Sequence, residues 1–226
     1  MSAATRKLAV IYHSAHGHTE HIARHVADGA REVPGTEVHL LRAQDLAESP
    51  DKLLDFDGLV LGSPTYLGGV SAAFKAFMDS TGRLWRDQRL KGRLAAGFTV
   101  SSLPAGDKQS TLMSMFVFAM QHGMAWVGNP VIPEQHLGVP YDEAANRLGS
   151  WSGLMAQAGH ASAANSFVRG DIKSALMFGR NFAESLHRWA RPCAARGKPS
   201  PLLPNARHRT ASPEANQDRF RPRIEG

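Results

Sequence analysis

The chain of 226 residues has room for one α/β domain of ordinary size and an extension. Its formal charge of +6 is concentrated in residues 190–226, where eight Lys or Arg and three acidic residues give +5; the remaining +1 excludes a basic nucleic-acid-binding body. Cys193 is the only cysteine, so an intramolecular disulfide and a cysteine-based metal cluster are excluded.

Apolar runs and helical periodicity predict strands that alternate with helices. Leu8–Tyr12 is a continuous apolar run, which is typical of a strand buried on both faces of a parallel sheet. The helix after it ends at Pro34-Gly35. The later predicted elements are strands at 38–41 and 59–63, a helix at 72–78, a strand at 94–100, a helix at 109–121, a short fifth strand at 125–127 and a helix at 172–189. Residues 129–169, rich in Gly, Pro and Ser, are predicted as long functional loops.

This alternation predicts an α/β fold for residues 1–189, with a doubly wound five-stranded parallel sheet and helices on both faces. Ligands of such sheets bind at the carboxyl ends of the strands, where the strand order reverses. Three predicted loops leave strands at that edge, at residues 14–19, 64–69 and 101–108. We therefore expect the active site where these loops converge.

The segment 190–226 differs in composition, with six of the thirteen prolines and scattered arginines, and we predict a disordered basic tail. Such a charge also suits nucleic acid or an anionic membrane, but the tail lacks interleaved aromatic residues, so a solvated extension is favoured and no nucleic-acid partner is expected. The N-terminal apolar run is too short for a signal peptide, and no stretch is long enough to span a bilayer. We expect a cytoplasmic protein.

The first loop, Ser14–Thr19, has the composition of a phosphate-binding loop. Free backbone N–H groups at a helix N-terminus attract phosphate, Gly17 permits close approach, and Ser14 and Thr19 supply hydroxyls. The loop has no lysine, which suits a monophosphate better than a triphosphate with magnesium. The alternative is that Ser14 and Thr19 only cap a helix.

Several motifs resemble one family in the same order. Tyr12–Thr19 is similar to the FMN-phosphate loop of the WrbA-type NAD(P)H:quinone oxidoreductases, which are flavodoxin-like proteins. Ser63–Ser71 resembles the second flavin loop of that family, and Phe74–Trp85 resembles the helix that follows it. Gly92–Ala95 and Gln121–Met124 also match. Agreement of several separated motifs over residues 7–189 is more specific than any single motif.

The resemblance implies a flavodoxin-like fold, FMN as cofactor, and NADH or NADPH as electron donor. It implies that Thr65, Tyr66 and Leu67 contact the ring system, although Tyr66 also fits an ordinary surface aromatic. The residues that it assigns to cofactor binding are Ser14, Ala15, His16, Gly17, His18, Thr19, Pro64, Thr65, Tyr66, Leu67, Gly68, Ser101, Ser102, Gly106 and Asp107. His16 matches a loop residue that lies near the donor site in the family.

The third loop, 101–108, departs most from the WrbA pattern. It is expected to hold the pyrimidine end of the ring, but Leu103-Pro104-Ala105 stands where that family has glycines. The following Gly106-Asp107-Lys108 resembles relatives that are FMN reductases. We therefore expect a stiffer loop and a side branch of the family.

Trp85 and His122 are the candidate catalytic residues. By the resemblance, His122 lies beside the flavin and interacts with a bound acceptor, whereas its position alone fits a histidine that stabilises a helix C-terminus. Trp85 is either a core aromatic or a wall of a flavin site, in its own or a neighbouring subunit. Hydride transfer belongs to the flavin, so no catalytic triad is required.

His18, His21 and His25 recur at helical spacing, as metal ligands on one helix face do. The same stripe continues to Asp28 and Glu32, so we interpret it as a solvated polar face and predict no metal.

Three functions remain open at this point. The first is an FMN-dependent oxidoreductase that passes electrons from NAD(P)H to quinones or similar acceptors, as a homo-oligomer (dimer or tetramer). The second is a flavodoxin-type electron carrier, and the third is a non-catalytic flavin-binding protein. A dedicated carrier usually has an acidic docking surface, and the near-neutral charge of residues 1–189 favours the enzyme.

Overall fold

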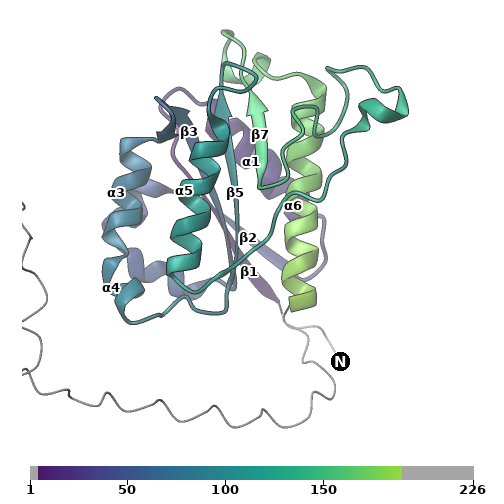
Figure 1. The fold of residues 1–226 in the computed structure, drawn as a ribbon. Coiled ribbons are helices and arrows are strands. Elements are labelled where there is room, and N and C mark those ends of the chain that lie inside the picture. Colours follow the sequence, from purple (N-terminus) through teal and green to yellow (C-terminus); the bar gives the residue numbers. More distant parts are fainter. Residues whose placement is uncertain (1–4, 190–226) are drawn as a thin grey trace, which may run out of the picture. The chain divides into compact units, whose positions relative to one another are not determined.

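A computed structural model describes residues 5–189, which form a three-layer α/β domain (Figure 1). The strands are β1 (Arg6–Tyr12), β2 (Thr36–Arg42), β3 (Gly58–Tyr66), β4 (Gly69–Val70), β5 (Leu94–Ser101), β6 (Ala125–Trp126) and β7 (Leu154–Gln157). The α-helices are α1 (His18–Arg31), α2 (Ala43–Ala47), α3 (Ala72–Ser80), α4 (Gly82–Arg86), α5 (Lys108–Gln121) and α6 (Arg169–Trp189). Short 3-10 helices lie at Pro50–Asp55, Glu134–Leu137 and Ala163–Asn165. The predicted tail, 190–226, lies outside the described residues.

The sheet has the order β2-β1-β3-β5-β6, and these neighbours are all parallel. The chain moves from β1 outward to β2 and then crosses back to β3 on the other side of β1. The strand order therefore reverses between β1 and β3, which is where a doubly wound sheet binds its ligand. The doubly wound parallel sheet predicted from the sequence is confirmed.

The fifth position of the sheet differs from the prediction, because two short strands share it. β6 pairs with the start of β5 at Leu94 and Ala95, while β7 pairs with its end, from Phe98 to Ser101. The prediction that 129–169 contains only loops is wrong, since β7 lies within it. Only Leu154 and Ala156 of this four-residue strand are buried, a pattern too short to show periodicity in the sequence.

Each face of the sheet has its own core. α1 and α6 cover one face, and α3, α4 and α5 cover the other (Figure 1). The two helices of the first face approach closely at Gly29 and Gly179, where an added Cβ would lie 1.9 Å from a carbonyl oxygen of the opposite helix. Phe178 and Phe182 of α6 are almost completely buried there, and each contributes about 1.5–3 kcal/mol by its burial. This packing fixes α1, and hence the loop that precedes it, against the sheet.

Candidate functional site

A cavity of about 360 Å³ lies at the carboxyl ends of β1, β3 and β5, and all three predicted loops contribute to it. Its size is within the usual range of small-molecule sites. Its lining residues are Ser14, Ala15, His16, His18, Thr19, Pro64, Thr65, Tyr66, Val100, Ser101, Ser102, Ala158, Gly159 and His160. The other residues assigned to cofactor binding, Gly17, Leu67, Gly68, Gly106 and Asp107, lie in the same loops but do not line the cavity.

A fourth segment of the cavity was absent from the prediction. Ala158, Gly159 and His160 follow β7 directly and also line the cavity. The sequence signal for them was a Gly after a short apolar stretch, which has meaning only once β7 is recognised as a strand of the same sheet.

The first loop leaves the N-terminus of α1 uncapped by any side chain. Gly17, with a φ of 85°, is the N-cap residue, and no side chain accepts a hydrogen bond from the first turn. The alternative that Ser14 and Thr19 only cap this helix is therefore wrong. Ser14 Oγ is buried and has no hydrogen-bond partner among residues 5–189. A free helix N-terminus and an unpartnered buried hydroxyl together suit a bound phosphate.

Buried polar side chains fix the base of the first two loops. His13 Nδ1 and Ser71 Oγ share a hydrogen bond of 2.7 Å, and Ser71 Oγ also accepts one from Phe74 N at the start of α3. Ser63 Oγ accepts a further bond from Ser71 N. Burial lowers the pKa of His13 below its ordinary value, so this ring is neutral near pH 7. The ends of β1 and β3 are thereby joined to α3.

The second loop is a tight hairpin between β3 and β4. Leu67 and Gly68 both have positive φ, as a type I′ turn requires, and the Leu67 side chain is fully exposed at the tip. The Thr65 hydroxyl is turned inward and is 2.8 Å from those of Thr99 and Thr111. Tyr66 is half-exposed and lines the cavity, so it is available to a ligand.

Trp85 and His122 do not reach this cavity in the same chain. They line a second cavity, of about 670 Å³, formed by α3, α4 and α5. His122 is buried, its Nε2 is 3.0 Å from Thr81 Oγ1, and burial lowers its pKa. The reason for the separation is that α5 starts at the third loop and runs back for 14 residues, or about 20 Å, before it reaches His122. His122 therefore lies in a different cavity from the one that the three loops form, and its place beside a flavin stays a prediction.

The histidine stripe of α1 is covered at its N-terminal end, which corrects the interpretation there, whereas Asp28 and Glu32 are exposed as expected. His21 stacks on Phe167 with ring centroids 5.5 Å apart, and His18 Nε2 lies 3.0 Å from Ser166 Oγ. The segment after β7 thus packs over the start of α1. Within residues 5–189, no group of three or more His, Cys, Asp or Glu side chains is placed to hold a metal ion.

The fold and the cavity define a flavodoxin-like α/β protein, and solved structures agree. A WrbA-like flavodoxin from Agrobacterium tumefaciens superposes with a TM-score of 0.60 and 28% identity, over 81% of this chain and 99% of that one. Flavodoxin 1 from Bacillus cereus, at 22% identity and a TM-score of 0.55, covers 79% of this chain and 97% of its own and supports the fold.

Sequence relatives define the family. A family model described as NADPH-dependent FMN reductase matches residues 43–136. A protein named NAD(P)H dehydrogenase (quinone) from Archaeoglobus fulgidus is 36% identical over 163 residues, which cover 62% of this chain and 85% of the relative. A protein of the same name from Chromohalobacter salexigens is 34% identical over 143 residues, or 55% and 71% of the two chains. The chain belongs to the NAD(P)H dehydrogenase (quinone) family.

Proposed function

We propose that this protein is an FMN-dependent oxidoreductase that transfers electrons from NADH or NADPH to quinones or similar acceptors. The observation that carries the proposal is the first loop, where a free helix N-terminus and the unpartnered Ser14 hydroxyl face a cavity at the strand ends. The relatives named NAD(P)H dehydrogenase (quinone) support the donor and the acceptor class. No helix within residues 5–189 is long and apolar enough to cross a bilayer, and we propose a cytoplasmic location.

In this proposal the phosphate of FMN lies on the first loop, and its ring lies between the second and third loops. Backbone N–H groups at the start of α1, together with Ser14 and Thr19, hold the phosphate. Pro64, Tyr66 and Ser102 border the ring, and the tip of the second loop, Leu67-Gly68, covers its edge. When bound, FMN supplies the chemistry of accepting a hydride and passing the electrons on. The chain itself orients the ring, excludes water from part of it and leaves one side accessible.

The mouth of the cavity provides that accessible side. His16 and His160 are both exposed and stand on different segments that line it. The nicotinamide donor and the quinone acceptor would use this opening in turn, and steady-state kinetics should then follow a ping-pong pattern with parallel double-reciprocal lines.

We also propose a homo-oligomer, a dimer or a tetramer, in which Trp85 and His122 act at the flavin site of a neighbouring subunit. Trp85, Met113 and Val117 are each between 41% and 49% exposed around the second cavity, which is an apolar surface suited to a second copy. Light scattering of the purified protein tests the oligomer, and a monomeric mass would remove Trp85 and His122 from the proposed site.

Purification and one assay test the function. The protein should show a flavin absorption spectrum, or acquire one with added FMN, and should oxidise NADH or NADPH when a benzoquinone is present. A colourless protein that FMN does not reconstitute would contradict the proposal. A flavin-loaded protein that oxidises neither nucleotide would instead favour the electron carrier, whose fold the Bacillus cereus flavodoxin shares.

A further inference from the structure

A buried lysine holds the third loop through hydrogen bonds. Lys108 is the first residue of α5 and has no exposed surface, although lysine is almost never fully buried unless it is paired. Its Nζ donates hydrogen bonds to the carbonyl oxygens of Leu103 and Pro104. Burial lowers the pKa of Lys108 to about 8. The hydrogen bonds of this ammonium group are therefore used to hold two successive carbonyls of the loop.

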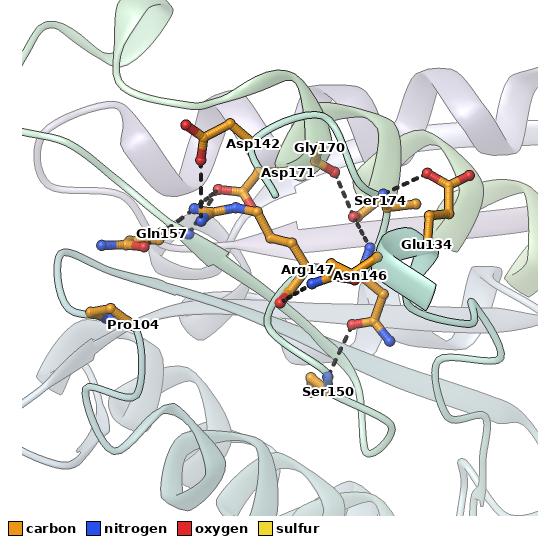
Figure 2. A network of polar contacts seen from close by, with 12 residues as sticks. Pro104, Glu134, Asp142, Asn146, Arg147, Ser150, Gln157, Gly170, Asp171 and Ser174 are labelled. Atoms are coloured by element: carbon orange, nitrogen blue, oxygen red, sulfur yellow. Dashed lines mark hydrogen bonds and ion pairs between the residues drawn. The ribbon is translucent and has the colours of Figure 1, made fainter. Parts of the chain in front are cut away.

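A second set of contacts holds the carbonyl of the preceding residue, Ser102. Gln157 of β7 donates a hydrogen bond from Nε2 to the Ser102 carbonyl oxygen at 3.1 Å. Its Oε1 accepts one from Arg147 Nη2 at 3.3 Å. Arg147 in turn makes a bidentate pair with Asp171, at 2.9 Å for both bonds. Figure 2 shows this network between the third loop, β7 and the start of α6. Arg147 and Asp171 are buried, so the geometry of Gln157 is fixed from the interior.

These contacts determine where the amide groups of the loop point. In a planar trans peptide the N–H lies opposite the C=O, and the described chain has no cis peptide. The carbonyls of Ser102 and Pro104 point to their supporting side chains, so the N–H groups of Leu103 and Ala105 point away from them. Pro104 has no N–H. Neither the Leu103 nor the Ala105 amide has an acceptor among residues 5–189. The loop thus has two unpaired donors, next to Ser101 and Ser102, which line the cavity.

The network also carries a surplus of positive charge. Lys108 and Arg147 are two buried cations, and within residues 5–189 the only buried carboxylate is Asp171, which pairs with Arg147. Asp142 lies 3.9 Å from Arg147 but is largely exposed, so solvent screens it. A buried surplus charge near a ligand favours the state of that ligand with more negative charge.

We infer that Lys108 and Gln157 are positioning residues for the ring of the bound flavin. They fix the loop so that the Leu103 and Ala105 amides donate to the pyrimidine end, and Lys108 raises the reduction potential of bound FMN. The inference rests on the proposed function, because it requires the ring to lie against the third loop.

Two variants distinguish the positioning of the loop from the effect of the charge on the reduction potential. Lys108→Met removes a hydrogen-bonding group and a charge, whereas Gln157→Leu removes only hydrogen bonds. We expect each to weaken the binding of both FMN and riboflavin about tenfold, because the contact is with the ring. Only Lys108→Met should also lower the midpoint potential, by about 30 mV for each tenfold change in the relative affinity for the two oxidation states. Lys173→Met, which removes an exposed cation paired with Glu134, is the matched control and should change neither the flavin affinities nor the midpoint potential.

Separate measurements distinguish a failure to fold from a failure of the proposed function. Thermal melting of the flavin-free variants shows whether they fold, and NMR signals of the Leu103 and Ala105 amides in flavin-free protein report the loop directly. Single sharp signals in the wild type that broaden in Lys108→Met support the positioning role even without flavin. If wild-type protein takes up no FMN, the proposed function fails. If Lys108→Met is folded and binds both flavins with wild-type affinity and potential, the inference is wrong although the proposed function stands.

Discussion

The first and third loops of the cavity keep their shapes by different means. The first loop depends on backbone geometry, since Gly17 adopts a left-handed conformation and the start of α1 is left free of side-chain caps. The third loop depends on distant side chains, since Gln157 and Lys108 hold its carbonyls and Arg147 and Asp171 hold Gln157. The turn of the first loop is thus set by its own backbone, although Ser71 and the segment after β7 pack against its two ends, whereas the carbonyls of the third loop are held by side chains from outside the loop. Substitutions in the two loops should therefore have different consequences for stability and for binding.

Asp171→Ala should give the largest change, because it leaves Arg147 as a buried cation without its carboxylate partner. The free energy of unfolding should fall by about 3–5 kcal/mol, measured by urea denaturation. Asp142→Ala removes the exposed carboxylate near the same Arg147 guanidinium. It should lower the free energy of unfolding by less than about 1 kcal/mol. Equal, small effects of the two changes would show that the third loop is not supported by a buried ion pair.

Gly17→Ala should affect both stability and binding. The new side chain would have to adopt a φ of 85°, and its Cβ would lie 3.2 Å from that of Ala163. We expect a loss of about 1–2 kcal/mol in the free energy of unfolding and at least tenfold weaker binding of FMN.

Gly138→Ala is the matched control for Gly17→Ala, because Gly138 has a φ of 80° with open space around it and lies outside the cavity. Gly138→Ala should lower the free energy of unfolding by a similar amount but leave the affinity for FMN unchanged. A similar loss of FMN affinity in both variants, measured by fluorescence titration, would contradict a specific role of the first loop.

Ser14→Ala should change binding without destabilising the fold. Its hydroxyl has no hydrogen-bond partner among the described residues, 5–189, so its removal should leave the melting temperature unchanged or slightly raised. FMN should bind about tenfold more weakly and riboflavin equally well, because only FMN carries the phosphate. Ser185→Ala, which removes a hydroxyl bonded to Asn181 O on α6, should alter neither affinity. Equal losses for FMN and riboflavin would move the phosphate away from this loop.

The smallest expected effect is the pH dependence of riboflavin binding. The pKa of Lys108 is lowered to about 8, so the ammonium form is present below that pH and is lost as the pH rises through it. Since the charged form makes the stronger hydrogen bonds, riboflavin affinity should fall a few-fold between about pH 7 and 9. The Lys108→Met variant should show a flat profile over the same range. A flat wild-type profile would indicate that Lys108 does not act on the ring.

Local patterns in the sequence were sufficient for the parts of the fold that are determined locally. The apolar runs predict β1, β3 and β5, because a buried parallel strand has a distinctive local composition, although β3 extends to Tyr66, past the predicted 59–63, and α1 begins at His18, inside the predicted loop. The phosphate-binding role of that loop stays a prediction. Because ligands of such sheets bind at the carboxyl ends of the strands, the sequence also predicts that the three loops meet at one cavity.

The features that the sequence could not predict all depend on non-local contacts. β7 has only four residues and becomes a strand because β5 offers it a free edge. The histidines of α1 look like a solvated stripe until Phe167 and Ser166 pack against them. Lys108 belongs to the Gly106-Asp107-Lys108 motif, but its burial depends on tertiary contacts that no local pattern shows. Trp85 and His122 line a different cavity from the three loops, and their role at a flavin site stays a prediction that rests on the resemblance.

Anaerobic stopped-flow mixing tests the central claim most directly. FMN-loaded protein mixed with NADPH or NADH should lose its flavin absorption in a single phase, and a second mixing with benzoquinone should restore it. A flavin that stays oxidised with both nucleotides would contradict the proposed oxidoreductase.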